Sequence, residues 1–374
     1  MNILVLGGTG PMGVPLVQKL SKEHKVYVTS RSKRESSANI TYIQGNAKEK
    51  EFLTRVFTML PWDAVVDFMV YSVAELQAYT PLFLDNTKQY IFISSSRVYA
   101  EAEGLITEHT PRLLEASQDE EYLKTSEYAL LKARGEDVLL KSGRTNFTII
   151  RPTITYNTYR LQLGVLEKEN WLYRALHGRS IVFSEDVNDK LTTMTLGDDV
   201  AEGIISVIDQ PKAFGEVFHI TSPVSLPWSE VLATYVAVLK KHLGRDIPVV
   251  MTNKSTNLKF PSRVYQLIYC RYFNRTFDNS KIAQFCDVNS FTLPQVGLAK
   301  CLEEFLKAPQ FNRISWELEA VNDKVSRERT PLSEIPHMGN KFTYFCYRNS
   351  MTFLLKPTFR LLNIVRKIKN KLFK

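Results

Sequence analysis

Short apolar runs alternate with stretches of helical periodicity through the first part of the chain. Runs of about four to six apolar residues bounded by turn residues predict strands, and apolar positions recurring every three to four residues predict helices. The predicted strands lie at 3–6, 26–29, 41–44, 64–69, 90–94 and 147–151, and the predicted helices include 15–21 and 126–141. This alternation favours an α/β fold with a Rossmann-type, doubly wound parallel sheet.

The alternation of strand-like and helix-like segments becomes less regular after Pro152. Helices are predicted at 165–177 and 227–242, and strand-like pieces at 192–195 and 216–220 are expected to return to the sheet. The pattern divides the chain into a first domain over 1–155 with returning segments about 191–221, a smaller C-terminal α/β domain from 156–190 and 222–310, a charged linker over 311–340 and a basic amphipathic tail over 341–374.

The net charge of +9 is concentrated at the end of the chain. Residues 335–374 hold six Lys, three Arg and no acidic residue, while positions 1–334 carry 39 basic and 39 acidic side chains. A basic appendage on a neutral body does not favour a protein that binds nucleic acid over its whole surface. A hydrophobic content of 44% excludes a wholly disordered or collagen-like chain.

The cysteines and the apolar runs indicate the cellular compartment in which the protein is expected. Four cysteines lie far apart, without a His companion at metal-ligand spacing: Cys270, Cys286, Cys301 and Cys346. They predict reduced, buried thiols in a cytoplasmic protein, and no metal site is expected. The apolar start is short and lacks a basic leader, so no signal peptide is expected. No run reaches about 18 apolar residues, so no membrane-spanning helix is expected.

A glycine loop directly follows the first predicted strand and precedes the first helix. Its sequence is Gly7-Gly8-Thr9-Gly10-Pro11-Met12-Gly13, in which Gly7, Gly10 and Gly13 have GxxGxxG spacing. Such glycines let the backbone turn tightly and approach a pyrophosphate at the positive end of a helix. The loop therefore predicts a dinucleotide-binding first domain, with Thr9, Pro11 and Met12 among the contacts.

The end of the second predicted strand bears on the choice of cofactor. A carboxylate there would accept the ribose hydroxyls of NAD, whereas an arginine would accommodate a 2′-phosphate. Residues 28–34 contain no acid and three cations, of which Arg31 is the first. NADP(H) is therefore favoured and NAD(H) is the alternative; an ordinary solvated basic turn would have the same composition.

Tyr128 and Lys132 are four residues apart and share one face of the predicted helix. Tyrosine is a poor base at its usual pKa of about 10, and a nearby ammonium lowers that pKa by favouring the phenolate. Ser94, Ser95 and Ser96 end the fifth predicted strand and offer hydroxyls that could hold a substrate oxygen. A tyrosine and a lysine at this spacing occur by chance in many helices, but together with the glycine loop and the serines in this order they are poorly explained by chance.

Over residues 1–306 the chain resembles the extended short-chain dehydrogenase/reductases, which act largely on nucleotide sugars. The resemblance rests on the glycine loop, the serines before Val98-Tyr99, the Tyr128/Lys132 helix continuing into Ala133-Arg134-Gly135-Glu136, Arg151-Pro152, Gly197-Asp198-Asp199 and 277–281. It implies that Ser95 is the catalytic hydroxyl with Ser96 a near alternative, that Tyr128 is the acid/base, and that Lys132 holds the nicotinamide ribose and tunes Tyr128. It also implies a sugar nucleotide in the small domain and a homodimer through a pair of helices.

Two positions depart from the family pattern. The 4,6-dehydratases of the family place an acidic pair directly after the hydroxyl residue, where this chain has Ser96 and Arg97. Elimination of water lacks its usual acid and base there, so reductases and epimerases remain, with 4-keto reduction favoured. Asn46 and Ala47 stand where the family usually has an acid near the adenine, and an asparagine can make a similar contact.

Several further side chains are candidate substrate contacts. Arg97 could meet a phosphate or carboxylate, or point to solvent. Arginines and aromatics of the later chain are plausible contacts that would also suit an ordinary surface or core: Arg151, Tyr159, Arg160, Trp171, Arg174, Arg263 and Arg271. Asp199 is interpreted as positioning a helix start.

A second hypothesis is a noncatalytic relative that senses dinucleotides or binds RNA. The intact set of Tyr128, Lys132 and Ser95 argues against it, because a pure scaffold has no physical need for that arrangement.

The end of the tail has an amphipathic pattern over 358–374. At about 100° per residue, Leu361, Ile364, Val365, Ile368 and Leu372 share one arc, and cations fill most of the rest. Such a helix suits an anionic membrane surface, which would make the protein peripheral at the membrane and would fit polysaccharide or glycolipid assembly. Docking on the body or on a second subunit is the alternative, and nucleic acid is the least favoured partner.

Overall fold

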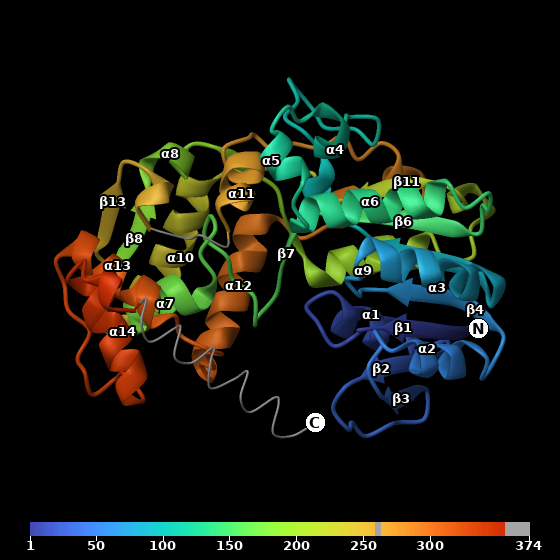
Figure 1. Cartoon of the computed structure of the whole chain (residues 1–374), viewed down its shortest axis with the longest axis horizontal. Helices are drawn as coiled ribbons and strands as arrows, with labels where there is room; N and C mark the ends of the chain where they lie inside the picture. Colours follow the sequence, from blue (N-terminus) through green and yellow to red (C-terminus); the bar gives the residue numbers. More distant parts are fainter. Residues whose placement is uncertain (259–262, 356–374) are drawn as a thin grey trace.

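The computed structural model describes residues 1–258 and 263–355. These residues include a seven-stranded parallel sheet in the order β11-β6-β5-β4-β1-β2-β3, which lies on the right in Figure 1. The strands are β1 (Asn2–Leu6), β2 (Lys25–Ser30), β3 (Ile40–Gln44), β4 (Trp62–Asp67), β5 (Thr87–Ile93), β6 (Phe147–Pro152) and β11 (Val217–Ile220). The strand order reverses between β1 and β4, and open α/β sheets bind ligands at the carboxyl ends beside such a reversal. The predicted doubly wound α/β fold is confirmed.

Strand β1 shows why both faces of the sheet are covered. Its alternate side chains Ile3 and Val5 pack into one apolar cluster, and Leu4 and Leu6 pack into another, all four with no exposed surface. Burying each such side chain contributes about 1.5–3 kcal/mol. The first cluster includes helices α1 (Gly13–Leu20) and α9 (Gly197–Ser206), and the second includes α2 (Lys50–Phe57), α3 (Val73–Asp85) and α6 (Tyr128–Leu140).

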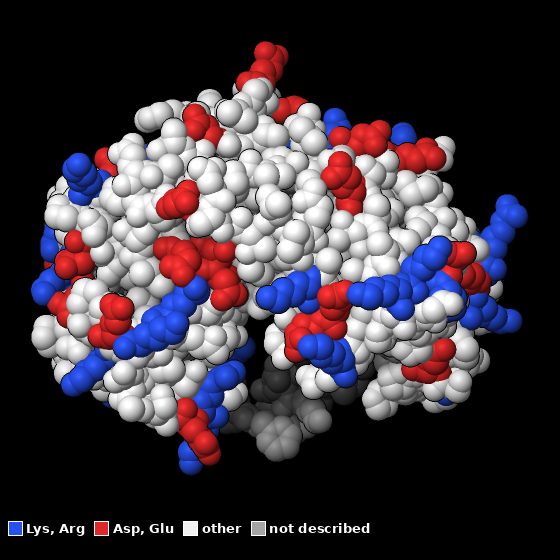
Figure 2. Space-filling view, turned by 180° about the vertical axis from the view of Figure 1, so that it is seen from behind, with Lys and Arg blue, Asp and Glu red and all other residues white. Residues whose placement is uncertain are grey.

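Charged side chains of both signs are interspersed over the face of the molecule that Figure 2 shows. The face seen from behind shows Lys and Arg beside Asp and Glu on both lobes of the molecule (Figure 2). This distribution fits the balanced composition of positions 1–334.

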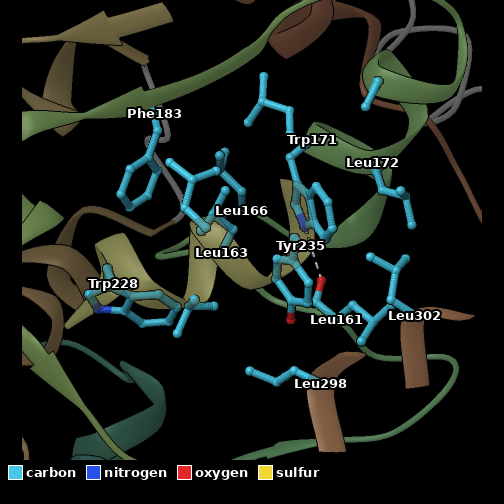
Figure 3. Close-up of a cluster of buried hydrophobic side chains, with 14 of the residues drawn as sticks. Leu161, Leu163, Leu166, Trp171, Leu172, Phe183, Trp228, Tyr235, Leu298 and Leu302 are labelled. Carbon is cyan, nitrogen blue, oxygen red and sulfur yellow. Dashed lines mark hydrogen bonds between the residues drawn. The ribbon is translucent and has the colours of Figure 1, made fainter. Parts of the chain in front are cut away.

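The smaller domain has its own apolar core. Trp171 stacks on Tyr235 with ring centres 4.5 Å apart, and its indole N–H donates to the carbonyl of Leu161 at 3.2 Å (Figure 3). The elements around this core are α7 (Lys168–Leu176), β8 (Ile181–Ser184), α8 (Glu185–Asn188), α10 (Trp228–Leu243), β13 (Val249–Thr252) and α12 (Pro294–Lys307). Strand β13 pairs in parallel with β8.

The two segments predicted to return to the sheet behave differently. The later one forms β11 beside β6, as predicted. The earlier one does not reach the central sheet: β9 (Leu191–Thr192) pairs with β12 (Leu226–Pro227), and β10 (Met194–Leu196) pairs with β7 (Ile154–Tyr156). The side chain of Thr193, between β9 and β10, donates to the carbonyl of Arg275 at 2.6 Å, which directs this segment toward the small domain.

The predicted linker over 311–340 is wrong for much of its length. It contains helix α13 (Trp316–Ser326), whose Glu319 and Asp323 are buried against the small domain. Arg174 on α7 donates to both carboxylates, at 2.7 and 2.8 Å. The sequence pattern predicts that these two carboxylates are exposed to solvent. Buried carboxylates are nevertheless stable when they are paired and hydrogen-bonded in this way.

The predicted tail begins inside a docked helix. Helix α14 (Met338–Arg348) packs on α13, where Tyr344 donates to Asp323 at 2.6 Å and Cys346 is fully buried. The amphipathic segment 358–374 lies outside the described residues. None of the helices in the described ranges combines the length and apolar character needed to cross a bilayer.

Candidate active site

The glycine loop joins β1 to α1 in the way that a bound pyrophosphate requires. Gly7 has φ of +71°, which suits glycine at the tight turn. A Cβ on Gly13 would lie 2.6 Å from the backbone of Gly8, so Gly13 permits the close approach of helix to strand. A Cβ on Gly10 would meet no atom within 4 Å, because this part of the loop faces open space. The loop therefore fits a dinucleotide phosphate on its outer side.

A cavity of about 330 Å³ lies beside this loop at the carboxyl ends of β1, β2 and β3. It brings together the predicted contacts Gly7, Thr9, Arg31, Asn46 and Ala47. Thr29, Ser30, Gly45, Lys48 and Met69 complete the lining, so within the described residues no carboxylate lines it. The prediction did not include Thr29, whose hydroxyl accepts the N–H of Gly7 at 3.1 Å and helps fix the loop.

Helix α6 begins at Tyr128 and places Lys132 one turn later, on the sheet side. The Lys132 ammonium donates to the carbonyl of Ile93 at 2.6 Å and to that of Met69 at 3.0 Å. Desolvation lowers the pKa of Lys132 to about 8, against the opposing influence of Asp67 and Glu136. Because Met69 also lines the cavity beside the glycine loop, Lys132 reaches the region where a cofactor would bind.

Asp67, at the end of β4, is a site residue that the sequence analysis missed. Its buried carboxylate accepts the Tyr90 hydroxyl at 2.6 Å and the N–H of Met69 at 2.8 Å. Burial raises its pKa, and these hydrogen bonds oppose that rise. Asp67 thus fixes the Met69 carbonyl that receives Lys132. An acid directly after the apolar run 64–66 was the available signal.

A second cavity, of about 470 Å³, holds the predicted reacting groups. Ser95, Ser96, Arg97, Tyr128 and Arg160 all line it. Ser95 directly precedes the short helix Ser96–Val98 and accepts the N–H of Arg97 at 3.2 Å. Tyr128 keeps 36% of its surface exposed in this cavity. The arrangement puts a phenol and a serine hydroxyl on the same wall.

Arg97 is a cation beside Tyr128. Its guanidinium lies 5.3 Å from the centre of the phenol ring and donates to Glu127, the residue before Tyr128. Burial in the pocket raises the pKa of Tyr128, while Arg97, Arg160 and a hydrogen bond with Ser95 oppose that rise. Arg97 therefore faces the site and does not point to bulk solvent.

Arg151 does not line either cavity, so its prediction as a substrate contact is corrected. It is 4% exposed and donates twice to Glu136, at 2.8 and 2.7 Å. Glu136 also accepts Ser94 at 2.5 Å and Arg112 at 3.0 Å. The ion pair between Arg151 and Glu136 therefore links the end of β6 to α6.

The remaining candidates divide between pocket and core. Arg263 and Arg271 line the larger cavity. Arg174 and Trp171 are buried in the small domain. Tyr159 is 65% exposed and lies outside both cavities. Asp199 accepts the N–H of Thr292 at 2.9 Å and so joins the start of α9 to the chain before α12. The pocket also includes residues that the sequence analysis did not name as site residues: Gln162, Glu167, Trp228, Cys270 and Arg275.

The larger cavity is strongly cationic. Arg97, Arg160, Arg263, Arg271 and Arg275 line it, and among the described lining residues Glu167 is the one carboxylate. Arg275 donates to the carbonyls of Tyr99 and Tyr269, while its buried Nε has no partner. Guanidinium groups in this number favour a ligand with phosphate or carboxylate groups.

The chain is similar to known proteins in sequence and in fold. The family model described as "NAD dependent epimerase/dehydratase family" matches residues 3–221. A 2′-dehydrokanamycin reductase of Streptomyces kanamyceticus is 24% identical over 238 residues, which are 62% of this chain and 64% of the relative. The match thus spans less than two thirds of that relative's length.

Solved structures show the same fold. A UDP-glucuronic acid 4-epimerase from Bacillus cereus, solved with UDP-glucuronic acid and NAD, is 16% identical with a TM-score of 0.61, over 82% of this chain and 99% of that chain. A dTDP-glucose 4,6-dehydratase from Bacillus anthracis, solved with NAD, is 19% identical with a TM-score of 0.60, over 82% and 97%. The resemblance found in the sequence is confirmed, and because the family model covers more than half of the chain, the protein belongs to the NAD dependent epimerase/dehydratase family.

Proposed function

We propose that this protein is a nicotinamide-dinucleotide-dependent reductase or epimerase of a nucleotide-activated sugar, with reduction of a 4-keto sugar favoured. The proposal rests on one observation: Tyr128 and Ser95 face the larger cavity, while Lys132 reaches the residue that borders the cavity beside the glycine loop. Substrate and cofactor would therefore meet at Tyr128.

The residues beside the glycine loop fit a dinucleotide. The open space over Gly10 accommodates a pyrophosphate, and Arg31, Asn46 and Ala47 surround the space for the adenosine half. Arg31 without a lining carboxylate favours a 2′-phosphate, and hence NADP(H). NAD(H) is the alternative, since both solved relatives described above contain NAD.

The bound dinucleotide would supply or accept the hydride. The protein's own groups handle the proton and the orientation of the sugar. Tyr128 donates its proton to the carbonyl oxygen in reduction and takes it from a hydroxyl in oxidation. Ser95 holds the same oxygen through a hydrogen bond, and Lys132 is placed to bind the ribose next to the nicotinamide.

The pocket also bears on the substrate and on the type of reaction. Five arginines suit the diphosphate of a sugar nucleotide. Elimination of water would need an acid and a base directly after Ser95. Arg97 occupies one of these positions and is paired with Glu127. The carboxylate of Glu127 is itself engaged, because it also accepts the N–H of Ala129 at 2.7 Å.

The test begins with the nucleotide that the purified protein retains, identified by mass and redox state. Tightly held NAD would indicate an epimerase that recycles its hydride internally. An empty protein that binds NADPH more tightly than NADH, and oxidises it when given a 4-keto nucleotide sugar, would support the reductase. A protein that binds none of these dinucleotides would overturn the proposal.

A further inference from the structure

Two buried side chains of opposite charge are connected through the backbone of Met69. The Asp67 carboxylate accepts the N–H of Met69 at 2.8 Å, and the Met69 carbonyl accepts the Lys132 ammonium at 3.0 Å. Asp67 has no exposed surface, and Lys132 is 3% exposed. A charge removed from water is costly unless other groups compensate it, so the partners of these two charges are informative.

The groups that hydrogen-bond to Asp67 are neutral. Its second oxygen accepts the Tyr90 hydroxyl at 2.6 Å, and the first accepts the N–H of Met69. The cation that favours the ionised form of Asp67 is Lys132. Burial raises the pKa of Asp67, and these hydrogen bonds and the charge of Lys132 oppose that rise.

The other carboxylate that acts on Lys132 is already paired with arginines. Glu136 receives Arg151 at 2.7 Å and Arg112 at 3.0 Å. Burial lowers the pKa of Lys132 to about 8, and Asp67 and Glu136 oppose that fall, with Asp67 the stronger of the two. Because two guanidinium groups balance Glu136, Asp67 is the carboxylate that is left to compensate Lys132.

The Lys132 ammonium has one more N–H than its two carbonyl partners accept. An ammonium has three N–H donors, and two of them go to the carbonyls of Met69 and Ile93. Met69 also lines the cavity beside the glycine loop, and a Cβ on Gly7 would lie 3.0 Å from its sulfur atom. The backbone that Asp67 holds therefore contacts both the lysine and the cofactor cavity.

We propose that Asp67 is a positioning residue of this site, whose carboxylate fixes the Met69 carbonyl and supplies the counter-charge that keeps Lys132 an ammonium directed at the cofactor ribose. Asp67 lines neither cavity, so it acts through Lys132. The inference rests on the proposed function for the ribose alone, because the contacts that join Asp67 to Lys132 are present in the protein without a dinucleotide.

The other titratable groups around the pair do not change charge near pH 8. Tyr71 and Tyr90 face Asp67, and burial raises the pKa of both well above the usual value. Burial also raises the pKa of Tyr128, on the same helix as Lys132. From β5, the uncharged ring of Phe92 packs 4.7 Å from the ammonium. A change of charge near pH 8 is therefore that of Lys132.

The first experiment follows Lys132 by NMR in protein labelled with carbon-13 at lysine Cε, without dinucleotide. The signal is identified by its absence from Lys132→Met. The wild-type midpoint should lie near pH 8. Asp67→Asn keeps the shape of the side chain but removes its charge, so the midpoint should fall by at least about half a unit. Asp63→Asn, which breaks a pair with Lys88 on the same strand, is the control and should leave it unchanged.

Lys132→Met supplies a second measurement that does not require Asp67→Asn to fold. Coupling between two sites is reciprocal, so loss of the ammonium should raise the pKa of Asp67. Carbon-13 NMR of the aspartate carboxyl groups measures this change, and the Asp67 signal is identified by its absence from Asp67→Asn or Asp67→Glu.

Dinucleotide affinity separates a loss of charge from a general structural defect. At pH 8, Asp67→Asn should bind NADPH or NADH, whichever the wild type prefers, about twofold to fivefold more weakly, because less of its Lys132 is protonated. At pH 6 both proteins hold the ammonium, and their affinities should be nearly equal. A structural defect would weaken binding equally at both pH values.

Four results would overturn the role of Asp67. These are an unchanged Lys132 midpoint in Asp67→Asn, an equal shift in Asp63→Asn, an unchanged pKa of Asp67 in Lys132→Met, and a loss of affinity that is the same at pH 6 and pH 8. A protein that shows both NMR shifts but binds no dinucleotide would overturn the proposed function, and with it the ribose, while supporting the coupling of Asp67 to Lys132.

Discussion

The guanidinium of Arg97 stacks over the ring of Tyr128, 5.3 Å from its centre, and is anchored there by Glu127. The sequence predicted that Lys132 would lower the pKa of this tyrosine. In the structure the lowering influences come from Arg97 and Arg160, and the Lys132 ammonium is directed to backbone carbonyls. Arg97 is therefore a positioning residue for the phenol, and its effect on proton transfer can be measured.

Replacing Arg97 with Gln should raise the pKa of Tyr128, because a cation that favours the phenolate is lost. The limb of the pH–rate profile that reports Tyr128 should move to higher pH by about one unit, in either direction of reaction. The control is Arg55→Gln, because Arg55 lies at the same 5.3 Å from the ring of Phe52 but outside the site. An unchanged or lowered midpoint in Arg97→Gln would contradict the assignment.

Changing Tyr128 to Phe removes the proposed proton donor and keeps the ring. The turnover rate should fall by about 10²–10⁴-fold, while dinucleotide binding and melting temperature stay near those of the wild type. Tyr159→Phe, at an exposed position outside both cavities, should change neither quantity. Full activity in Tyr128→Phe would favour the noncatalytic hypothesis.

Gly10 and Gly13 should respond differently to alanine. At Gly10 the added methyl meets no protein atom, so the fold should be retained while the affinity for the dinucleotide falls by about tenfold or more. At Gly13 the methyl collides with the backbone of Gly8, which should cost about 1–3 kcal/mol of folding stability. Calorimetry and thermal melting separate the two effects, and equal behaviour of the two variants would refute this account of the loop.

Changing Glu136 to Gln should destabilise the protein by about 3 kcal/mol or more. Glu136 has no exposed surface and is the carboxylate that receives Arg151 and Arg112, which would be left without that counter-charge. Denaturant unfolding measures the loss. Asp85→Asn, which breaks an exposed pair with Arg144, serves as the control and should cost at most about 1 kcal/mol.

Asp323→Asn should weaken the attachment of α13 by about 3 kcal/mol at neutral pH. Despite burial, hydrogen bonds from Tyr344 and the charge of Arg174 hold the pKa of Asp323 below its usual value. A carboxylate with a depressed folded-state pKa stabilises the fold fully above its unfolded pKa, and this stability is lost as pH falls through the folded pKa. The stability gap between wild type and variant should therefore narrow in acid, and a gap independent of pH would contradict the role of the charge.

The sheet and the helix of Tyr128 could be predicted because their signals are local. Strand β1 is a short apolar run that ends at a glycine, and Tyr128 and Lys132 are one helical turn apart. In both cases residues that are neighbours in the sequence determine what is observed. Arg31 and Asn46 could be predicted too, because they closely follow the adjacent parallel strands β2 and β3 and therefore meet at one edge of the sheet.

The part of the larger cavity that residues between 263 and 277 line could not be predicted in this way. Cys270 lies in the short π-helix Leu267–Arg271, and Arg275 follows it without any periodic pattern. Likewise, Glu319 reads as an exposed charge, because its partner Arg174 is 145 positions away. The prediction of Arg151 as a substrate contact was wrong for the same reason. Nothing in the sequence distinguishes an arginine that pairs with an internal carboxylate from one that contacts a ligand.

The pairing of Arg174 with α13 also constrains the order of events during synthesis. Arg174 and Arg179 are buried in the small domain, and their carboxylates come from Glu319, Asp323, Glu328 and Glu334. A nascent chain has all seven strands of its central sheet once Ile220 has left the ribosome. At that stage the two arginines have no such partners, and burying an unpaired cation costs several kcal/mol. The small domain therefore reaches its final packing only after residues 319–334 have been synthesised, when all seven strands of the central sheet are already available.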